Sequence, residues 1–144
     1  MPEKRTVARA RKDAKEGKSA STQAGEFVRE EMDHIREGKH GARSTKQAIA
    51  IGLSKARRAG VKLPAPKKGR ASASTRHKAE QDLKRGRSSK PVSKKRSAAR
   101  TKALKREPRS AASHSALSRH AKQAARTRKG RGTATPTRKS RSRK

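Results

Sequence analysis

Residues 26–63 read EFVREEMDHIREGKHGARSTKQAIAIGLSKARRAGVKL and hold most of the large apolar side chains of this protein. The chain has thirteen Leu, Ile, Val and Phe residues in 144, and eight of them lie in this stretch. Thirteen in 144 is about 9%, well below the roughly 20% expected of a globular chain. We therefore expect a mostly disordered chain with a small all-α module, a helical hairpin of about residues 24–37 and 45–59.

The first helix of this hairpin carries one apolar stripe. Val28, Met32 and Ile35 fall at i, i+4 and i+7, which places their side chains on the same helix face. Gly38 follows as the natural end of the helix, and the S-x-x-Q capping box that begins at Ser44 opens the second helix. The predicted hairpin core is Phe27, Val28, Met32, Ile35, Ile49, Leu53 and Ala56.

One apolar residue of the second helix, Ile51, falls on its polar side. Ile49, Ile51 and Leu53 also alternate as they would in a strand, but the capping box, the length and Gly60 favour a helix. A hairpin of this size is too small to fold around its own core. We expect it to become ordered with a second copy, another protein or nucleic acid, so a homo-oligomer through the hairpin is one predicted arrangement.

The segment before the hairpin, residues 1–22, is predicted to be a charged arm that forms at most a fraying helix. Arg9 and Asp13 stand four residues apart, and such a pair contributes about 0.2–0.5 kcal/mol to a helix. A helix this short is marginal in water when nothing packs on it. The hairpin module is expected to extend over residues 23–66.

Residues 67–144 are predicted to be a disordered tail rich in Lys, Arg, Ala and Ser. The chain carries 44 Lys and Arg against 11 Asp and Glu, a formal net charge of +33, and this tail holds 28 of the bases with only 3 acids. Two pieces, about 75–85 and 109–128, form nascent helices in this prediction and become helical once phosphate neutralises their charges. Counterion release would make binding to a nucleic acid strong and salt-dependent.

The candidate nucleic-acid-binding residues are bases of the second hairpin helix and of the tail. Contacts from such residues to phosphates position a protein without reading sequence. The seven residues between the two helices also exceed the three or four of a helix-turn-helix, which disfavours sequence-specific recognition. The candidates are Lys46, Lys55, Arg57, Arg58, Lys94, Lys95, Arg96, Lys105, Arg106, Arg126, Arg128, Lys129, Arg131, Arg138, Lys139, Arg141, Arg143 and Lys144.

The sequence contains no arrangement typical of an enzyme. There is no Cys, no Gly-rich phosphate loop, no G-x-S-x-G and no H-E-x-x-H motif, so we expect no catalytic residues and no cofactor. Glu30 and His34 stand four residues apart on one helix face, but nothing completes a metal-ligand set and the surrounding positive charge opposes a cation. We therefore expect no metal site.

Membrane binding is also disfavoured. No apolar run approaches the length of a membrane span or of a secretory signal. An interfacial helix needs large apolar or aromatic side chains on one face, and the only aromatic residue, Phe27, lies among acidic residues. The expected location is the cytoplasm.

Two stretches resemble known families. Residues 25–69, GEFVREEMDHIREGKHGARSTKQAIAIGLSKARRAGVKLPAPKKG, resemble a small bacterial family known only as domain of unknown function 6496, and the resemblance extends over about residues 1–69. It implies a bacterial source and brings no activity. The run TPTRK at 135–139 is similar to the T/S-P-x-K/R units of histone H1 tails, which place bases along an A·T-rich minor groove. The tail as a whole is similar in composition to bacterial histone H1-like proteins.

These features favour a non-enzymatic, largely sequence-nonspecific DNA-binding protein of the bacterial nucleoid, with DNA preferred over RNA. Two alternatives stay open. One is an RNA- or ribosome-associated basic protein, for which the same charge would serve. The other is a protein-interaction module, the hairpin, that its tail tethers to nucleic acid.

Overall fold

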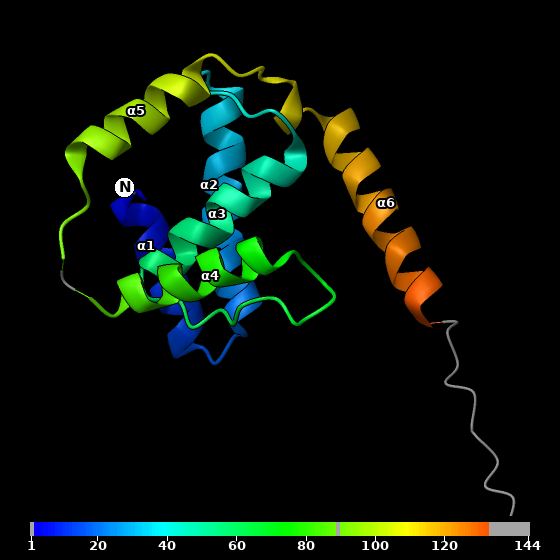
Figure 1. Cartoon of the computed structure of the whole chain (residues 1–144), viewed down its shortest axis with the longest axis horizontal. Coiled ribbons are helices and arrows are strands. Elements are labelled where there is room, and N and C mark those ends of the chain that lie inside the picture. The colour runs from blue at the N-terminus through cyan, green and yellow to red at the C-terminus, as the bar shows by residue number, and fades with distance from the viewer. Residues whose placement is uncertain (1, 89, 133–144) are drawn as a thin grey trace, which may run out of the picture.

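The computed structural model describes residues 2–88 and 90–132, and these residues form helices connected by short loops (Figure 1). The prediction of a mostly disordered chain is wrong, because helices also form in the predicted arm and throughout most of the predicted tail. The helices are α1 Lys4–Lys15, α2 Ala20–Arg36, α3 Thr45–Arg58, α4 Ala73–Gly86, α5 Lys94–Lys105, the 3-10 helix η1 Ser110–Ala112 and α6 His114–Gly132.

Helices α2 and α3 form the hairpin at the centre of the fold. Helix α2 begins four residues earlier than predicted, because Ser19 caps it by accepting a hydrogen bond from the Thr22 N–H at 3.3 Å. Helix α3 begins at the capping box, where Ser44 Oγ accepts from the Gln47 N–H at 3.1 Å. The two helices approach closely at Gly52, where an added Cβ would lie 2.7 Å from the Val28 Cα.

Helix α1 packs on α2, so the described part of the predicted arm, residues 2–22, is not a fraying helix. Thr6, Ala10 and Asp13 of α1 are buried in this contact. The opposite charges at i, i+4 predicted the helix, but burial against α2 is what stabilises it in this position.

Helix α4 covers the side of α3 that the sequence analysis took to be polar and exposed. Ser54 of α3 donates a hydrogen bond to Asp82 of α4 at 2.5 Å. Ile51 precedes Ser54 by three residues and so lies on the same side of α3, where it is buried. Gly86 allows α4 to approach α3 closely, since a Cβ there would lie 2.1 Å from the Arg57 carbonyl oxygen. The position of Ile51, which did not fit a single apolar stripe, therefore indicates a second packing face on α3.

Two apolar clusters line the hairpin, and both depend on alanine. Counting Leu, Ile, Val and Phe underestimated the core, because small residues bury little area each but let helices approach closely. The first cluster contains Met32, Ile35, Ala42, Ala48, Ala111 and Ala112, with Val28, Ile49 and Leu117 packed against it. The second contains Ala10, Ala24, Phe27, Ala56 and Val61, with Val7, Ala20, Leu53, Ala59 and Leu63 packed against it.

The segment after α5 returns to the hairpin and docks on the α2–α3 connection. The Gly41 N–H donates to the Leu104 carbonyl at 2.9 Å, and the Ala42 N–H donates to the Pro108 carbonyl at 3.0 Å. The Thr45 hydroxyl donates to the Ala111 carbonyl at 2.5 Å. These bonds join residues more than sixty positions apart, so much of the predicted tail belongs to the fold.

Arg109 strengthens this docking at the C-terminal end of α2. Its guanidinium donates to the Ile35 carbonyl at 3.3 Å and also to the Arg36 carbonyl. In return, Arg36 donates to the Ala112 carbonyl at 3.1 Å. A cation at this end of a helix satisfies carbonyls that have no partner within the helix and interacts favourably with its dipole.

The hairpin has little apolar surface left for a second copy of the chain. Both of its apolar clusters are covered from within the chain, by α1 and by the segment around η1. Among the described residues, Val92 is the one exposed large apolar side chain, at 57% exposure. Association through the hairpin core, as the sequence analysis expected, would therefore require α1 or η1 to leave.

Candidate nucleic-acid interface

Helices α5 and α6 carry the concentrated positive charge of the described structure. Each has six Lys or Arg residues and no acidic residue. All twelve basic side chains are exposed. They are Lys94, Lys95, Arg96, Arg100, Lys102 and Lys105 on α5, and Arg119, Lys122, Arg126, Arg128, Lys129 and Arg131 on α6.

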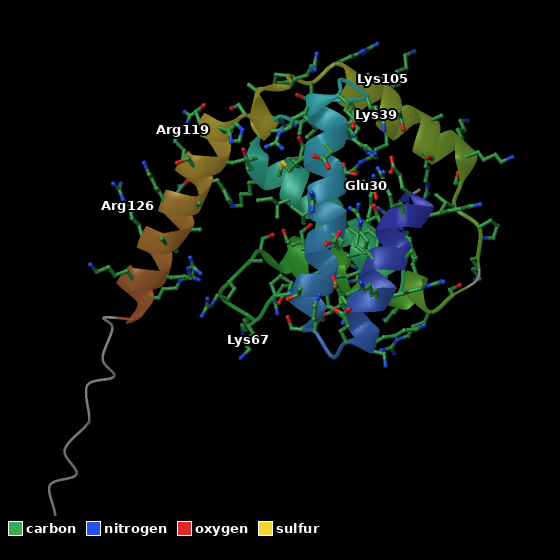
Figure 2. All side chains as sticks on the ribbon, turned by 180° about the vertical axis from the view of Figure 1, so that it is seen from behind. Glu30, Lys39, Lys67, Lys105, Arg119 and Arg126 are labelled. Carbon is green, nitrogen blue, oxygen red and sulfur yellow. The ribbon has the colours of Figure 1, made fainter. Side chains whose placement is uncertain are left out.

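Four of the α6 bases form a stripe along one face. Arg119, Lys122, Arg126 and Lys129 stand at i, i+3, i+7 and i+10, so they share an arc of roughly 80° at 100° per residue. The stripe is about 15 Å long at 1.5 Å per residue. Arg119 and Arg126 are labelled in Figure 2, where α6 lies at the edge of the molecule. We call these four residues the α6 stripe.

The opposite face of α6 packs toward the rest of the chain. Ala116, Leu117, His120 and Ala124 are partly buried there, and the start of the helix contacts η1 and α3. This anchoring fixes which side of α6 faces outward. The α6 stripe is therefore held away from the core by the apolar face of the same helix.

Helix α5 is exposed over nearly its whole length. No other described helix packs against it, and it has no buried residue. Ser93 caps its start by accepting from the Arg96 N–H at 3.4 Å, and the hydrogen bond to the Leu104 carbonyl holds its end. Its six bases spread over an arc of roughly 240° around the axis at 100° per residue, so α5 presents no single stripe.

The bases of these two helices are free of acidic partners within the described structure. Across residues 2–88 and 90–132, every salt bridge involves a base of α1, α2, α3 or the loops beside them, and none involves α5 or α6. Acidic residues gather instead on α2, where Glu30 is labelled in Figure 2. The charges of α5 and α6 are thus uncompensated by the protein.

Three of the four predicted bases of α3 form hydrogen bonds or ion pairs within the fold. Arg57 is buried and donates to the Leu63 carbonyl at 3.1 Å and to the Pro64 carbonyl at 3.2 Å. Burial lowers the pKa of its guanidinium, although Asp82 nearby raises it. Lys55 forms an ion pair with the buried Glu31.

The remaining two predicted bases of α3 differ in whether they have an acidic partner. Arg58 lies 3.7 Å from an Asp82 oxygen and donates to the Ser54 carbonyl at 3.4 Å. Lys46 is exposed and is paired with no acidic residue in the described parts of the chain. Lys46 is therefore the α3 base that stays available for a phosphate.

The predicted bases of the tail fall into two groups. Lys94, Lys95, Arg96, Lys105 and Arg106 lie on or directly after α5, and all are exposed. Arg126, Arg128, Lys129 and Arg131 lie on α6 and are exposed as well. The candidates Arg138, Lys139, Arg141, Arg143 and Lys144, together with the TPTRK unit at 135–139, lie outside the described residues.

Half of the α6 stripe was not among the predicted nucleic-acid-binding residues. Arg119 and Lys122 were left out because they are not adjacent to other bases along the chain. The helical spacing of 119, 122, 126 and 129 was a signal that could have found them. It was not used, although residues 109–128 were predicted to become helical on phosphate, because the bases were chosen by their runs along the chain.

Comparison with known families finds a match within the first half of the chain. Residues 3–68 match DUF6496, a family of unknown function. The match covers α1, α2, α3 and the loop after them, and it ends before α4. No curated protein and no solved structure matches the chain. The DUF6496 region therefore corresponds to the hairpin with its α1 cover, whereas α5 and α6 lie beyond it.

None of the helices within the described ranges combines the length and the apolar character that crossing a membrane requires.

Proposed function

We propose that this protein binds nucleic acid without catalysing a reaction, and that duplex DNA is its preferred ligand. The observation that carries the proposal is the α6 stripe, four exposed bases on one helix face with no acidic residue on the helix. Helix α5 adds six more exposed bases. These helices extend from a folded core whose residues 1–37 hold nine bases and eight acids and are therefore nearly neutral.

The length and charge of the stripe suit a phosphate backbone. Duplex DNA carries one negative charge per about 1.7 Å of axis, so four bases over about 15 Å can each approach a phosphate. Arg and Lys contacts of this kind are charge-assisted hydrogen bonds that position a protein without selecting a sequence. A nucleoid protein that binds many sites on the chromosome needs this property.

The proposal is tested by removing the stripe. The variant Arg119→Gln, Lys122→Gln, Arg126→Gln and Lys129→Gln should lower the salt dependence of DNA binding. Four lost phosphate contacts reduce the slope of log K against log salt by about 3.6. Between 50 and 200 mM salt this slope corresponds to about 150-fold in affinity.

A matched control separates the stripe from net charge. The variant Arg5→Gln, Arg11→Gln, Lys12→Gln and Lys15→Gln removes the same four charges from exposed positions of α1. It should change the slope much less than the stripe variant does. Equal slopes for the two variants would overturn the assignment to α6.

The same titration compares duplex DNA with structured RNA of equal length. A preference for duplex DNA supports the nucleoid role, whereas a preference for RNA at physiological salt would replace it with an RNA-associated role. Far-UV circular dichroism of each variant establishes that the helices are retained.

A further inference from the structure

Three side chains from α2 and the following loop converge beneath the hairpin connection. Glu31 and His34 belong to α2, and His40 lies in the loop before α3. One ligand atom from each lies within 4.8 Å of the other two. The Glu31 side chain is fully buried, and those of His34 and His40 are only 13% and 11% exposed. We call these residues the Glu31 cluster.

Hydrogen bonds outside the cluster fix which imidazole nitrogen carries a proton. His40 Nδ1 lies 3.0 Å from the Gly41 carbonyl oxygen, which can only accept, so Nδ1 carries the hydrogen. His34 Nε2 lies 3.0 Å from a Glu3 carboxylate oxygen, so Nε2 carries the hydrogen of that ring. In the neutral rings, His40 Nε2 and His34 Nδ1 then hold the lone pairs.

Both of these nitrogens lie near the Glu31 carboxylate. His40 Nε2 lies 3.2 Å from Glu31 Oε2, and His34 Nδ1 lies 4.0 Å from Oε1. Lys55 donates to Oε1. Oε2 is buried and has no hydrogen-bond partner among the described residues. The Lys55 ammonium therefore satisfies Oε1 only, and Oε2 meets two imidazole lone pairs with no donor of its own. Such an arrangement is costly unless a cation lies between these three atoms.

We propose that the Glu31 cluster binds a divalent transition metal ion of the Zn²⁺ type. The ligands are His34 Nδ1, His40 Nε2 and Glu31 Oε2. Two imidazoles and one carboxylate form a ligand set that zinc takes with a water molecule in the fourth position. Imidazole ligands disfavour Ca²⁺ and Mg²⁺, which take oxygen ligands.

The distances and the outer contacts fit this assignment. In a tetrahedral zinc site, ligand atoms about 2.0–2.1 Å from the metal lie roughly 3.3 Å apart. The 3.2 Å between His40 Nε2 and Glu31 Oε2 matches that edge, whereas the ligand atoms as a set lie within 4.8 Å of one another, so His34 would move toward the ion on binding. Metal-binding histidines donate their other N–H to a carboxylate or a backbone carbonyl. Here Glu3 and the Gly41 carbonyl accept those two hydrogens.

No metal site was predicted, because nothing along the chain completes a ligand set with Glu30 and His34 and the surrounding charge is positive. Glu30 accepts hydrogen bonds from the Glu3 N–H instead, at 3.2 and 3.3 Å. Only the path of the loop brings His40 to Glu31, and no spacing rule along the chain shows that path. The metal would tie α2 to the loop that contains Gly41, on which the segment after α5 docks.

The competing explanation is an ion-pair network without metal. A protonated His40 would donate its Nε2–H to Glu31 Oε2, and the pair would need no cation.

Zn²⁺ binding separates the two possibilities. The full chain, without a histidine tag and freed of metal by a chelator, is titrated with Zn²⁺ by calorimetry. Co²⁺ is then added to a second sample, and its visible absorption reports the coordination.

Two substitutions remove a ligand nitrogen and keep the outer hydrogen bond. His40→Asn retains an amide donor for the Gly41 carbonyl, and His34→Gln retains one for Glu3. His77→Asn on the exposed surface of α4 is the control. We expect one Zn²⁺ per chain in the wild type and the control, with a raised thermal midpoint. Binding should be lost in His34→Gln and His40→Asn, and weakened about 10–100-fold in Glu3→Gln.

The wild-type protein alone can refute the proposal, whether or not the variants fold. Failure to bind Zn²⁺ at micromolar concentration, or a Co²⁺ spectrum identical to that of the free ion, would leave the ion-pair network as the explanation. Zinc binding that persists in the double variant His34→Gln, His40→Asn would place the metal elsewhere on the chain.

Discussion

Replacing Gly41 by Ala should detach the segment after α5 from the hairpin. An added Cβ would lie 1.9 Å from the Glu107 carbonyl oxygen, 2.5 Å from its carbon and 2.6 Å from the Pro108 oxygen. All three contacts are with backbone, which cannot rotate away as a side chain can. The segment must therefore move, and the hydrogen bonds that hold it must lengthen or break.

The size of the effect follows from the bonds that depend on this contact. The Gly41 and Ala42 N–H groups each donate to the displaced segment, and two such bonds contribute about 2 kcal/mol. The Arg109 contacts to the end of α2 involve a charged donor and contribute about 1.5–3 kcal/mol. Gly41→Ala should therefore destabilise the docked state by about 2–5 kcal/mol, at least 30-fold in the docking equilibrium.

Amide hydrogen exchange measures this equilibrium directly. In the Gly41→Ala variant, exchange should accelerate at residue 41, at Ala42 and through residues 104–113. The amides of α2 and α3 should keep most of their protection. Gly25→Ala is the matched control, because a Cβ at Gly25 meets nothing within 4 Å. In the helical setting of α2 that substitution should stabilise by about 0.5–1 kcal/mol.

Unchanged exchange in residues 104–113 of Gly41→Ala, with a thermal midpoint equal to that of the wild type, would refute the reasoning. It would mean that the segment does not rest on the α2–α3 connection. Loss of protection throughout the whole chain would show instead that docking and hairpin form one cooperative unit.

Three further predictions concern packing, pH and ligand-induced structure. Gly52→Ala, which brings a Cβ to 2.7 Å from the Val28 Cα, should lower the urea midpoint by separating α2 from α3; a midpoint at or above the wild type would contradict the packing. A hydrogen bond from Lys18 lowers the pKa of the Glu16 carboxyl below its ordinary value of 4.5. Its stabilisation is therefore present above that pH and is lost as pH falls below it, so Lys18→Met should be more destabilising at pH 7 than at pH 3 in urea titrations. Duplex DNA should raise the helix signal of circular dichroism by screening like-charge pairs such as Arg96 and Arg100, whereas NaCl of equal ionic strength should do so less.

The hairpin illustrates which parts of the fold were accessible from sequence. Ser44 and Gln47 mark the start of α3 through hydrogen bonds that are local in the chain, and Gly38 adopts a positive φ of 77° directly after α2. Such signals depend on residues three or four positions apart. By contrast, the second packing face of α3 was missed because α4, which packs on α3, is a separate element.

The sequence predicted that basic residues contact phosphates, but it did not show which of these residues are available to a ligand. Composition alone indicated phosphate contacts, but it treated every base as equally available. Arg57 and Lys55 satisfy backbone carbonyls and a buried carboxylate, which no charge count distinguishes from solvent exposure. The α6 stripe required knowing that the segment is helical and which of its faces is anchored.

The sequence by itself determined the capped ends of the hairpin helices, their apolar stripes and the strong charge asymmetry between the first helices and the tail. These properties are encoded in neighbouring residues. Only the tertiary structure decided that Ala111 and Ala112 complete a core begun by Met32 and Ile35, and that Glu31 faces His40. The physical reason is that close packing of small residues and backbone hydrogen bonds join distant segments without leaving a periodic pattern in the chain.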